Sequence, residues 1–359
     1  MIQKTNHFDA GQGKFLLLLI AAFIMFSFIS CKNTSSGKLP QYVDVIRSAY
    51  ADSTQFNPEQ GQEDWKLYQN NPVIITGGKG EWDAGALGSM SVIKLRDTLH
   101  IYYEAWGSRT DSGALTEYLT LQIGHATSIN GIDWIKDTLN PVIHKGASGE
   151  WDQDGTWDPF VLFEDNKYKM WYGGGADSHC NWGYAESVDA IHFTKKGQIS
   201  HLGNVEDGHI VHDIKNSKYY MYYWDRKFEP MGLFRSESIN ETDFDFENAV
   251  NIKIEGEKYP GMYKFTHVIL ENGSWIMFYS NFLRPDCPDA TVRLATSNDG
   301  INWTSQNNNL LRGMDGEVIQ IDTELYLMYF GPQGFFDAKD CNIRLAAYAG
   351  KLTDLYSNK

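Results

Sequence analysis

Acidic and histidine side chains recur in this sequence just before runs that alternate apolar and polar residues. Such side chains can transfer protons, and two carboxyl groups held close together can act as a general acid and a general base. Crowding of like charges raises the pKa of one carboxyl group, so that it stays protonated near neutral pH. The candidates for this chemistry are Asp83, Asp152, Asp154, Asp158, Glu206, Asp207, His209, His212, His267, Asp315 and Glu317, with Ser89 and Thr266 as neutral polar neighbours.

The segments around these side chains have the pattern of β-hairpins. From Trp157 to Tyr172 the chain alternates apolar and polar residues, passes through Glu164-Asp165-Asn166, and alternates again. Period-2 alternation on both arms, with turn-forming residues between them, predicts two antiparallel strands. Each copy of the pattern ends in an aromatic-rich strand, and the other copies begin at Ser91, His209, His267 and Glu317.

A second motif, Ser-x-(Asp/Asn)-x-x-x-aromatic, follows each of the first four hairpins. Its copies begin at Ser128, Ser187, Ser238 and Ser297. Repeats of about 40 to 50 residues with four strands each are typical of propeller blades. The sequence therefore predicts an all-β fold, a five-bladed β-propeller, in which the leading ends of the inner strands face a central channel. The alternative is a β-sandwich with accidental internal similarity.

The run Asn71–Ile75 (NPVII) predicts how the ring closes. Its twin, Asn140–Ile143 (NPVI), follows the first Ser motif and is expected to be the outer strand of the first blade. The last blade runs only through Asn342–Tyr348 and lacks an outer strand of its own. We therefore expect Asn71–Ile75 to supply that strand, so that the N-terminal strand closes the ring.

The N-terminal segment has the features of a bacterial lipoprotein signal. Lys4 and Lys14 precede an apolar run from Phe15 to Phe28, and Cys31 follows at the expected cleavage site. The run is shorter than the roughly 20 apolar residues of a membrane-spanning helix. We expect a signal peptide (1–30), a tether and lead-in (31–64) and a propeller domain (65–359), with Cys31 lipidated. The protein would then be a membrane-anchored lipoprotein, periplasmic or on the cell surface.

Composition limits the class of ligand. Asp and Glu total 46 against 31 Lys and Arg, and the formal charge of −15 argues against nucleic acid as a partner. Aromatic residues make up 14% of the chain. Most must pack between blades, but 11 Trp also suit stacking on sugar rings. Apart from Cys31, the widely spaced Cys180, Cys287 and Cys341 form no metal motif and allow at most one disulfide. We expect no cofactor and no metal.

Two tracts give the sequence a specific resemblance. NPVI-x-x-G-x-x-G-x-WD and WDP-x-V-x-x-x-x-x-x-Y-x-MWY-x-G resemble those of secreted bacterial members of the propeller glycoside hydrolase superfamily, which includes families 43, 32, 62, 68, 117 and 130. In these enzymes three carboxylates meet at the channel mouth: a base, an acid and a third that orients the acid and tunes its pKa. The resemblance implies hydrolysis of a poly- or oligosaccharide, with inversion at the anomeric carbon.

The resemblance transfers to individual residues only in part. Asp158, in Trp157-Asp158-Pro159, matches the orienting aspartate of the second blade. The family's base enters the first blade, but aligning the two Glu-Trp-Asp repeats places Ser89 opposite Asp158. Asp83 is the nearest substitute, although its twin Asp152 favours a structural turn for both. Glu206 is the nearest match to the family's acid, with Asp207 as its rival.

Further candidates would bind the substrate. His209 and His267 lead inner strands and could bind sugar hydroxyls or replace Glu206 as the acid, as a histidine does in family 117; a structural role is the alternative. Glu317 would bind a hydroxyl, and Trp157 would stack on the sugar.

Two other functions remain open on the same fold. One is a non-catalytic glycan-binding lipoprotein, favoured by the missing first-blade aspartate. The other is a glycoside phosphorylase, which would need a basic pocket for phosphate. Carbohydrate is the expected partner in every case, together with the membrane through the lipid anchor.

Overall fold

The computed structural model describes residues 41–59, 62–107, 121–226, 232–257, 263–281, 290–332 and 341–357, all within one unit, Leu39–Lys359. The predicted signal peptide and Cys31 lie outside the described residues. Within the described part of the chain, neither helix has the length and apolar character needed to cross a membrane.

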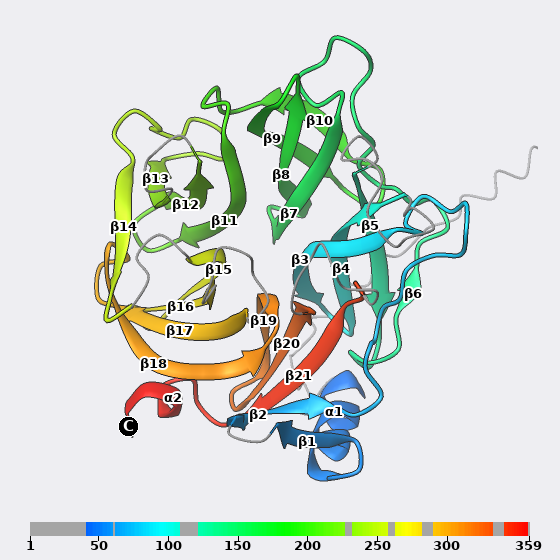
Figure 1. Ribbon diagram of the computed structural model, residues 1–359, viewed down its shortest axis with the longest axis vertical. Helices are drawn as coiled ribbons and strands as arrows, with labels where there is room; N and C mark the ends of the chain where they lie inside the picture. Colours follow the sequence, from blue (N-terminus) through cyan, green and yellow to red (C-terminus); the bar gives the residue numbers. More distant parts are fainter. Residues whose placement is uncertain are drawn as a thin grey trace, which may run out of the picture. The chain divides into compact units, whose positions relative to one another are not determined.

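Antiparallel meanders follow one another along the chain and provide nearly all of the regular structure (Figure 1). Two of them are separate four-stranded sheets. The first consists of β3 (Ala86–Leu95), β4 (Thr98–Trp106), β5 (Gln122–Ser128) and β6 (Ile135–Lys136), and the second of β7 (Gly155–Glu164), β8 (Lys167–Ala176), β9 (His179–Ser187) and β10 (Thr194–Gln198).

Two further four-stranded units are joined edge to edge. Their outer strands, β14 and β18, pair in parallel, so that the two units form one eight-stranded sheet. One unit consists of β11 (Val205–Asp213), β12 (Lys218–Asp225), β13 (Gly232–Ser238) and β14 (Val250–Glu255). The other consists of β15 (Tyr263–Glu271), β16 (Ser274–Asn281), β17 (Thr291–Ser297) and β18 (Asn302–Arg312).

The last sheet combines strands from distant parts of the sequence. Its order is β1-β2-β21-β20-β19, so N-terminal strands extend a C-terminal meander. Its strands are β1 (Phe56–Glu59), β2 (Gln62–Tyr68), β19 (Met314–Asp322), β20 (Leu325–Gly331) and β21 (Arg344–Ala349). The two helices are α1 (Gln41–Ala51) and α2 (Asp354–Ser357).

The hairpin between β7 and β8 illustrates how the sequence specifies these units. Glu164 pairs with Lys167, and the two residues between them, Asp165 and Asn166, have φ of 52° and 59°. Two consecutive left-handed residues form the tight turn that matches the twist of the flanking strands, and Asp and Asn tolerate that conformation. The predicted hairpin is therefore present, with its turn at the predicted residues.

The five first strands of the meanders, β3, β7, β11, β15 and β19, are the inner strands. Each contacts the next along the chain, and β19 contacts β3 (Figure 1). The predicted all-β propeller architecture is confirmed. The number of five blades stays a prediction, because the β14–β18 pairing merges two of the units into one sheet.

The two Asn-Pro-Val-Ile tracts make matching contacts. The side chain of Asn140 accepts a hydrogen bond from His125 N–H (2.7 Å) and donates one to His125 C=O (2.9 Å). The side chain of Asn71 does the same with Leu345, over 2.7 and 2.9 Å. Ile143 bridges to Ile123, and Ile74 bridges to Ile343. The predicted contact of Asn71–Ile75 with the C-terminal strand is thus present, but only as an isolated bridge. The strand beside β21 is β2, and the outer strand of the first sheet is β6, so neither Asn-Pro-Val-Ile tract is the outer strand that the sequence predicted.

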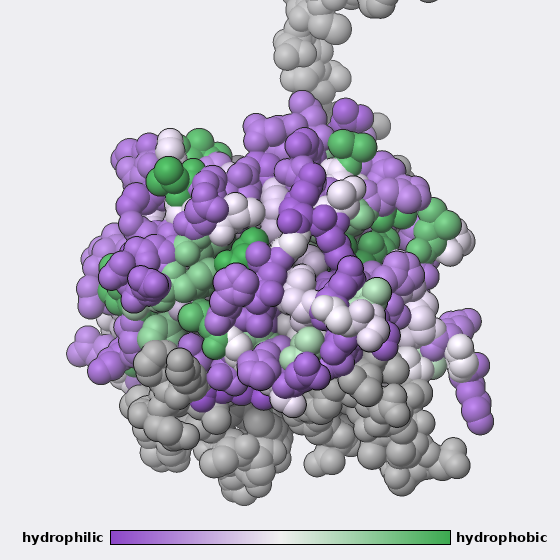
Figure 2. Space-filling view, turned by 90° about the horizontal axis from the view of Figure 1, so that it is seen from above, coloured by the Kyte–Doolittle hydropathy of each residue, from purple (hydrophilic) through white to green (hydrophobic). Residues whose placement is uncertain are grey.

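Apolar clusters fill the spaces between neighbouring sheets. One joins Leu99 and Tyr103 of the first sheet to Leu325 and Leu327 of the last. Most large aromatic residues serve this packing, among them the fully buried Trp65, Trp171, Trp182 and Trp303. The face in Figure 2 is mostly hydrophilic with small apolar patches, as the acidic composition would suggest.

Candidate active site

A β-bulge occurs at the same place in every inner strand. Between two aligned pairs, the inner strand has one residue more than its partner, as from Trp157 to Phe160 opposite Gly173 and Trp171. A bulge re-aims the side chain at the extra position. The corresponding pairs in the other inner strands are Leu87/Met90, Glu206/His209, Lys264/His267 and Met314/Glu317.

The first residue of each bulge is Gly88, Asp158, Asp207, Phe265 or Asp315. The last four have φ of 44°, 52°, 49° and 58°, in the left-handed region. That conformation costs most L-residues about 1–2 kcal/mol, and Asp tolerates it better than most because its short side chain bonds locally. Three of the five positions therefore present a carboxylate from a backbone shape that suits aspartate.

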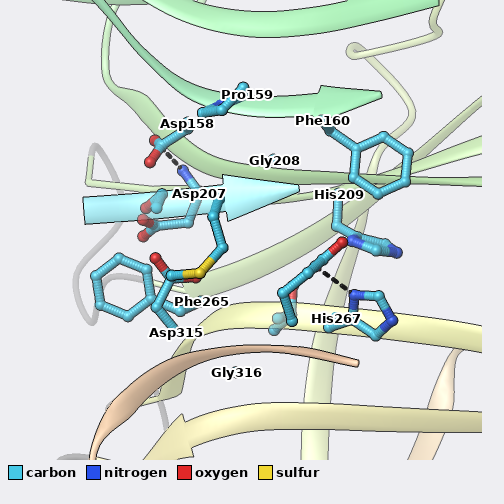
Figure 3. Close-up of a pocket in the computed structure, with 14 residues that line it drawn as sticks. Asp158, Pro159, Phe160, Asp207, Gly208, His209, Phe265, His267, Asp315 and Gly316 are labelled. Carbon is cyan, nitrogen blue, oxygen red and sulfur yellow. Dashed lines mark hydrogen bonds and ion pairs between the residues drawn. The ribbon is translucent and has the colours of Figure 1, made fainter. Parts of the chain in front are cut away.

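These bulges surround a hollow of about 360 Å³, open solvent included (Figure 3). Each of the five inner strands contributes residues to its wall. The described lining consists of Ser89, Met90, Asp158, Pro159, Phe160, Asp207, Gly208, His209, Phe265, Thr266, His267, Asp315, Gly316 and Glu317.

Asp158 is bound to its neighbours by two hydrogen bonds. Its Oδ2 accepts the backbone N–H of Asp207 at 2.9 Å (Figure 3). Its own N–H donates to Glu104 Oε2, also at 2.9 Å. Burial raises the pKa of Asp158, whereas the hydrogen bond from Asp207 lowers it. Burial also raises the pKa of Glu104, and the charge of Asp158 adds to that effect. Asp158 is therefore fixed in place between a buried carboxyl group and the next inner strand.

Asp207 and Asp315 have different electrostatic surroundings. Burial raises the pKa of Asp207 to about 6, against the opposing effect of Lys264, whose Nζ lies 3.0 Å from Asp207 Oδ2. Burial raises the pKa of Asp315 well above its ordinary value, and the charges of Asp158 and Asp207 raise it further. A carboxyl group beside a cation ionises more readily than a buried carboxyl group beside like charges. The first can therefore act as a base and the second as an acid.

Lys264 also binds Glu206. Its Nζ lies 3.2 Å from Glu206 Oε2 and 4.1 Å from the ring centroid of Trp224, and Arg226 pairs with the other oxygen of Glu206. A general acid must start protonated, whereas two cations stabilise the ionised carboxylate. Glu206 is not among the described residues that line the hollow. Asp207, the alternative acid in the sequence, is therefore the carboxylate that β11 contributes to the site.

The two histidines lie at equivalent positions, directly after the bulges of β11 and β15. His209 Nε2 is 3.0 Å from the C=O of Val268, which fixes Nε2 as a donor, and burial lowers the pKa of His209 well below its ordinary value. His267 Nδ1 lies 2.6 Å from Glu317 Oε2, and Glu317 Oε1 accepts the N–H of Val92. In the neutral His209, Nδ1 therefore carries no proton and can accept a hydrogen bond.

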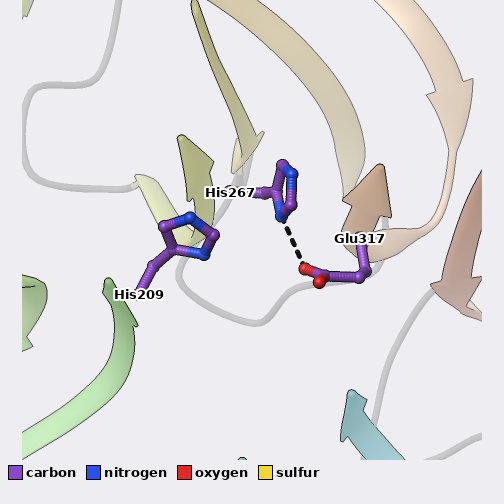
Figure 4. A group of neighbouring side chains, drawn as sticks. All are labelled: His209, His267 and Glu317. Atoms are coloured by element: carbon purple, nitrogen blue, oxygen red, sulfur yellow. Dashed lines mark hydrogen bonds and ion pairs between the residues drawn. The ribbon is translucent and has the colours of Figure 1, made fainter. Parts of the chain in front are cut away.

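His209, His267 and Glu317 also form the group best suited to a metal among the described residues (Figure 4). One ligand atom from each lies within 4.8 Å of the others. Two imidazoles and a carboxylate are ligands that zinc accepts. The short contact between His267 and Glu317 satisfies both groups without an ion, so their arrangement also fits a metal-free site.

Asp83 lies away from the described lining of the hollow. It is 2% exposed and pairs with Lys136 over 2.5 Å. Its twin, Asp152, is 1% exposed and pairs with Lys195 over 2.6 Å. The repeat therefore reproduces one buried ion pair twice, which supports the structural alternative for Asp83. Trp157 also lies outside the described lining, and its indole lies against Gly173 and Gly175, where a Cβ would be 2.4 and 2.7 Å from ring atoms.

Strand register corrects one step of the sequence alignment. Counting from the Glu-Trp-Asp repeats places Ser89 opposite Asp158, but the bulges place Gly88 there. The segment from Asp83 to the bulge is one residue shorter than the segment from Asp152, which shifts the match. The first blade lacks a bulge carboxylate in either alignment.

Asp315 was a candidate in the sequence without a specific role, and Glu104 was not a candidate. A signal for Asp315 was present, because Asp158-Pro159, Asp207-Gly208 and Asp315-Gly316 all place Asp before a residue common in turns, at the start of an inner strand. No comparable signal exists for Glu104, which lies in the second strand of its meander and reaches Asp158 from another sheet.

Comparison with curated proteins gives partial relatives. No family model matches the sequence. Two uncharacterized proteins of Mycobacterium tuberculosis, from strains CDC 1551 / Oshkosh and ATCC 25618 / H37Rv, are each 27% identical to the chain over 139 residues. The match covers 36% of this chain and 42% of each relative, so it spans less than half the length of these proteins.

Solved structures share the fold over most of their length. A thermostable family-43 glycoside hydrolase has a TM-score of 0.58 at 18% identity, covering 76% of this chain and 90% of that one. A putative glycoside hydrolase from Parabacteroides distasonis ATCC 8503 has 0.61 at 17%, covering 80% and 97%. The β-1,2-mannobiose phosphorylase from Listeria innocua has 0.63 at 14%, also covering 80% and 97%. The chain therefore has the propeller fold of the family-43-like glycosidases.

Proposed function

We propose that this protein is a glycoside hydrolase acting on a poly- or oligosaccharide. The observation that carries the proposal is the convergence of three bulge carboxylates, Asp158, Asp207 and Asp315, on one hollow. Glycoside hydrolysis needs an acid to protonate the leaving oxygen and a carboxylate on the other side of the sugar ring. The fold shared with glycosidases supports the same conclusion.

The roles follow from the surroundings of each carboxyl group. Asp207, beside Lys264 and with a pKa of about 6, is ionised at neutral pH and acts as the base that deprotonates a water molecule. Asp315, whose pKa burial raises well above the ordinary value, stays protonated and acts as the acid. Asp158 orients Asp207 through the hydrogen bond to its N–H.

We propose that the reaction inverts the anomeric configuration. Inverting enzymes leave room for a water molecule, with carboxyl groups about 6.5–9.5 Å apart, against about 5–5.5 Å in retaining enzymes. The inner strands that present Asp207 and Asp315 are not neighbours, since β15 contacts both β11 and β19. That spacing supports the wider gap, and proton NMR of the first product formed would test it.

The phosphorylase alternative has weaker support. Phosphate would need free cations at the hollow, and both Lys264 and Arg226 are already paired with carboxylates. The glycan-binding alternative keeps the support of Gly88, the first-blade bulge position without a carboxylate. Finding a saccharide that binds without being cleaved would favour it.

The experiment is a screen of the purified protein on plant and algal polysaccharides, with detection of reducing ends, followed by Asp207→Asn and Asp315→Asn. Loss of an acid or base costs roughly 10² to 10⁴ in rate, so we expect each variant to lose turnover in that range while staying folded. Asp97→Asn, in the exposed β3–β4 turn, is the matched control. Full activity in both site variants on a substrate with a poor leaving group would refute the assignment.

We further propose that Cys31 carries a lipid anchor and that the protein faces the periplasm or the cell surface. The proposal rests on the apolar run that ends just before Cys31. Cys31→Ser should release the protein into the soluble fraction or stall its processing. Unchanged partitioning with membranes would contradict it.

A further inference from the structure

Phe265 stands out among the bulge residues. It occupies the position that carries Asp158, Asp207 and Asp315 in three other inner strands, and it has the same left-handed φ, 49°. Asp adopts this conformation far more readily than a bulky aromatic residue. Strained residues of this kind cluster at ligand-binding sites, where function compensates for their cost.

The surroundings of Phe265 combine packing with access to the hollow. The ring is partly buried and packs against an apolar cluster that includes Ala86, Trp106 and Met314. Phe265 also lines the hollow together with Asp207 and Asp315 (Figure 3). An aromatic ring that is held by packing and still borders a polar hollow can bind a ligand with one apolar face and polar edges.

Buried hydroxyl side chains of the lining indicate which polar groups the ligand carries at its edges. Ser89 is 6% exposed and Thr266 is 7% exposed, and both line the hollow. The hydroxyl oxygen Thr266 Oγ1 is buried and makes no direct hydrogen bond in the described structure. The Ser89 hydroxyl lies beside Asp158 and Asp315 and lowers the pKa of both carboxyl groups by hydrogen bonding. Buried hydroxyl groups are normally paired, so a ligand with hydroxyl groups of its own would complete this site.

The charge of the lining excludes one class of sugar. Asp158, Asp207, Asp315 and Glu317 contribute carboxyl groups, and the described lining contains neither Lys nor Arg. The ammonium group of Lys264 is shared between Glu206 and Asp207. A carboxylate or sulfate on the ligand would therefore meet the ionised Asp207 and its neighbouring carboxyl groups, and no Lys or Arg of the described lining would pair with it.

We propose that Phe265 is the platform on which the hollow stacks the apolar face of an uncharged sugar ring, and that the site rejects uronates. The proposal deepens the proposed hydrolase function and names its substrate class. Phe265 sets specificity by contacting the sugar, while the three aspartates carry the chemistry.

The test uses isothermal titration of the full-length protein with neutral sugars and their uronates. The neutral probes are D-glucose, D-galactose and D-mannose, and the charged probes are D-glucuronate, D-galacturonate and D-mannuronate. We expect at least one neutral sugar to bind, and its own uronate to bind at least tenfold more weakly. Equal or tighter binding of the uronate, or binding of none of the six, would overturn the proposal.

Two variants separate the effect of the aromatic ring from the effect of the left-handed backbone conformation. Phe265→Asn removes the ring and keeps a residue that tolerates left-handed φ, whereas Phe265→Tyr keeps the ring. We expect the dissociation constant of the neutral sugar to rise on the order of tenfold in Phe265→Asn, as for loss of an aromatic contact. Phe265→Tyr should stay within about threefold of the parent.

A folded Phe265→Asn variant that binds as tightly as the parent would refute the platform. On a cleaved polysaccharide, Phe265→Asn should raise KM more than it lowers kcat. Neutral-sugar binding that depends on Phe265, without cleavage of any substrate, would keep the platform and reject the hydrolase. The two proposals therefore fail separately.

Discussion

Lys264 controls the ionisation of the candidate base. Its ammonium group lies 3.0 Å from Asp207 Oδ2 and 3.2 Å from Glu206 Oε2, and the aromatic face of Trp224 holds it in place. Burial raises the pKa of Asp207, and the positive charge of Lys264 opposes that effect. Lys264 is thus a positioning residue that acts through Asp207.

Lys264→Met should shift the pH dependence of the reaction. Removal of the cation raises the pKa of Asp207 from about 6, by about one pH unit or more for a neighbouring charge. The base works only when ionised, so activity is lost as the pH falls through that pKa. The acid limb of the kcat/KM profile should therefore move to higher pH, and the alkaline limb should move less.

The control for this prediction is Lys218→Met. It removes a lysine of β12 that is paired with Glu237. Its pH profile should match that of the parent protein. An acid limb that stays in place in Lys264→Met would show that Asp207 is not the base, whereas a merely structural role for Lys264 would lower stability without moving the limb.

The sequence indicated that the leading ends of the inner strands meet. It did not indicate the register between paired strands. The alternating runs and the Asp165-Asn166 turn were sufficient to predict the hairpins. The bulges were not predictable, because a bulge is defined by the partner strand. Because the bulge positions were unknown, the sequence alignment matched Ser89 to Asp158 incorrectly.

The ion pairs of the site escaped prediction for a related reason. Lys264 and Glu206 are 58 residues apart and meet because β11 and β15 are neighbouring inner strands. Periodicity reports which face of a strand is buried, and it does not report which charges face each other across two blades. The sequence therefore indicated Glu206 as a general acid, whereas in the structure it is a carboxylate paired with cations.

The repeated Glu-Trp-Asp element yields a prediction that separates structure from catalysis. Asp83 and Asp152 form matching buried pairs with Lys136 and Lys195. Asp83→Asn and Asp152→Asn should each lower the free energy of unfolding by about 1–3 kcal/mol, as for loss of a charged hydrogen bond. Denaturant titration would measure this, and kcat should stay within about twofold, since neither aspartate touches the hollow.

The contrary result would restore the original interpretation of Asp83. If Asp83→Asn lost roughly 10² or more in kcat with unchanged stability, while Asp152→Asn stayed active, Asp83 would be the base. The matched pair makes this comparison direct, because both variants remove the same contact from two copies of one element.

In the propeller as a whole, the segment before the first meander is joined to β21 by contacts that the repeat made predictable. Asn71 binds Leu345 as Asn140 binds His125, so the tract before the first meander pairs with the last strand of the chain. The sequence did not indicate β1 and β2, which belong to no copy of the repeated hairpin. It also underestimated the lead-in, since Ile46 and Phe56 are fully buried against β20 and its neighbours.

Truncations at the N-terminus test this arrangement. A chain that begins at Leu39 keeps every described contact and should unfold cooperatively. A chain that begins at Trp65 loses Ile46 and Phe56, each contributing about 1.5–3 kcal/mol by burial, and should be folded but less stable. A chain that begins at Gly77 also loses β2 and the Ile74–Ile343 bridge, which leaves β21 as an open edge that should aggregate. Size-exclusion chromatography and thermal unfolding would rank the three, and a soluble, cooperative protein beginning at Gly77 would show that the N-terminal strands are dispensable.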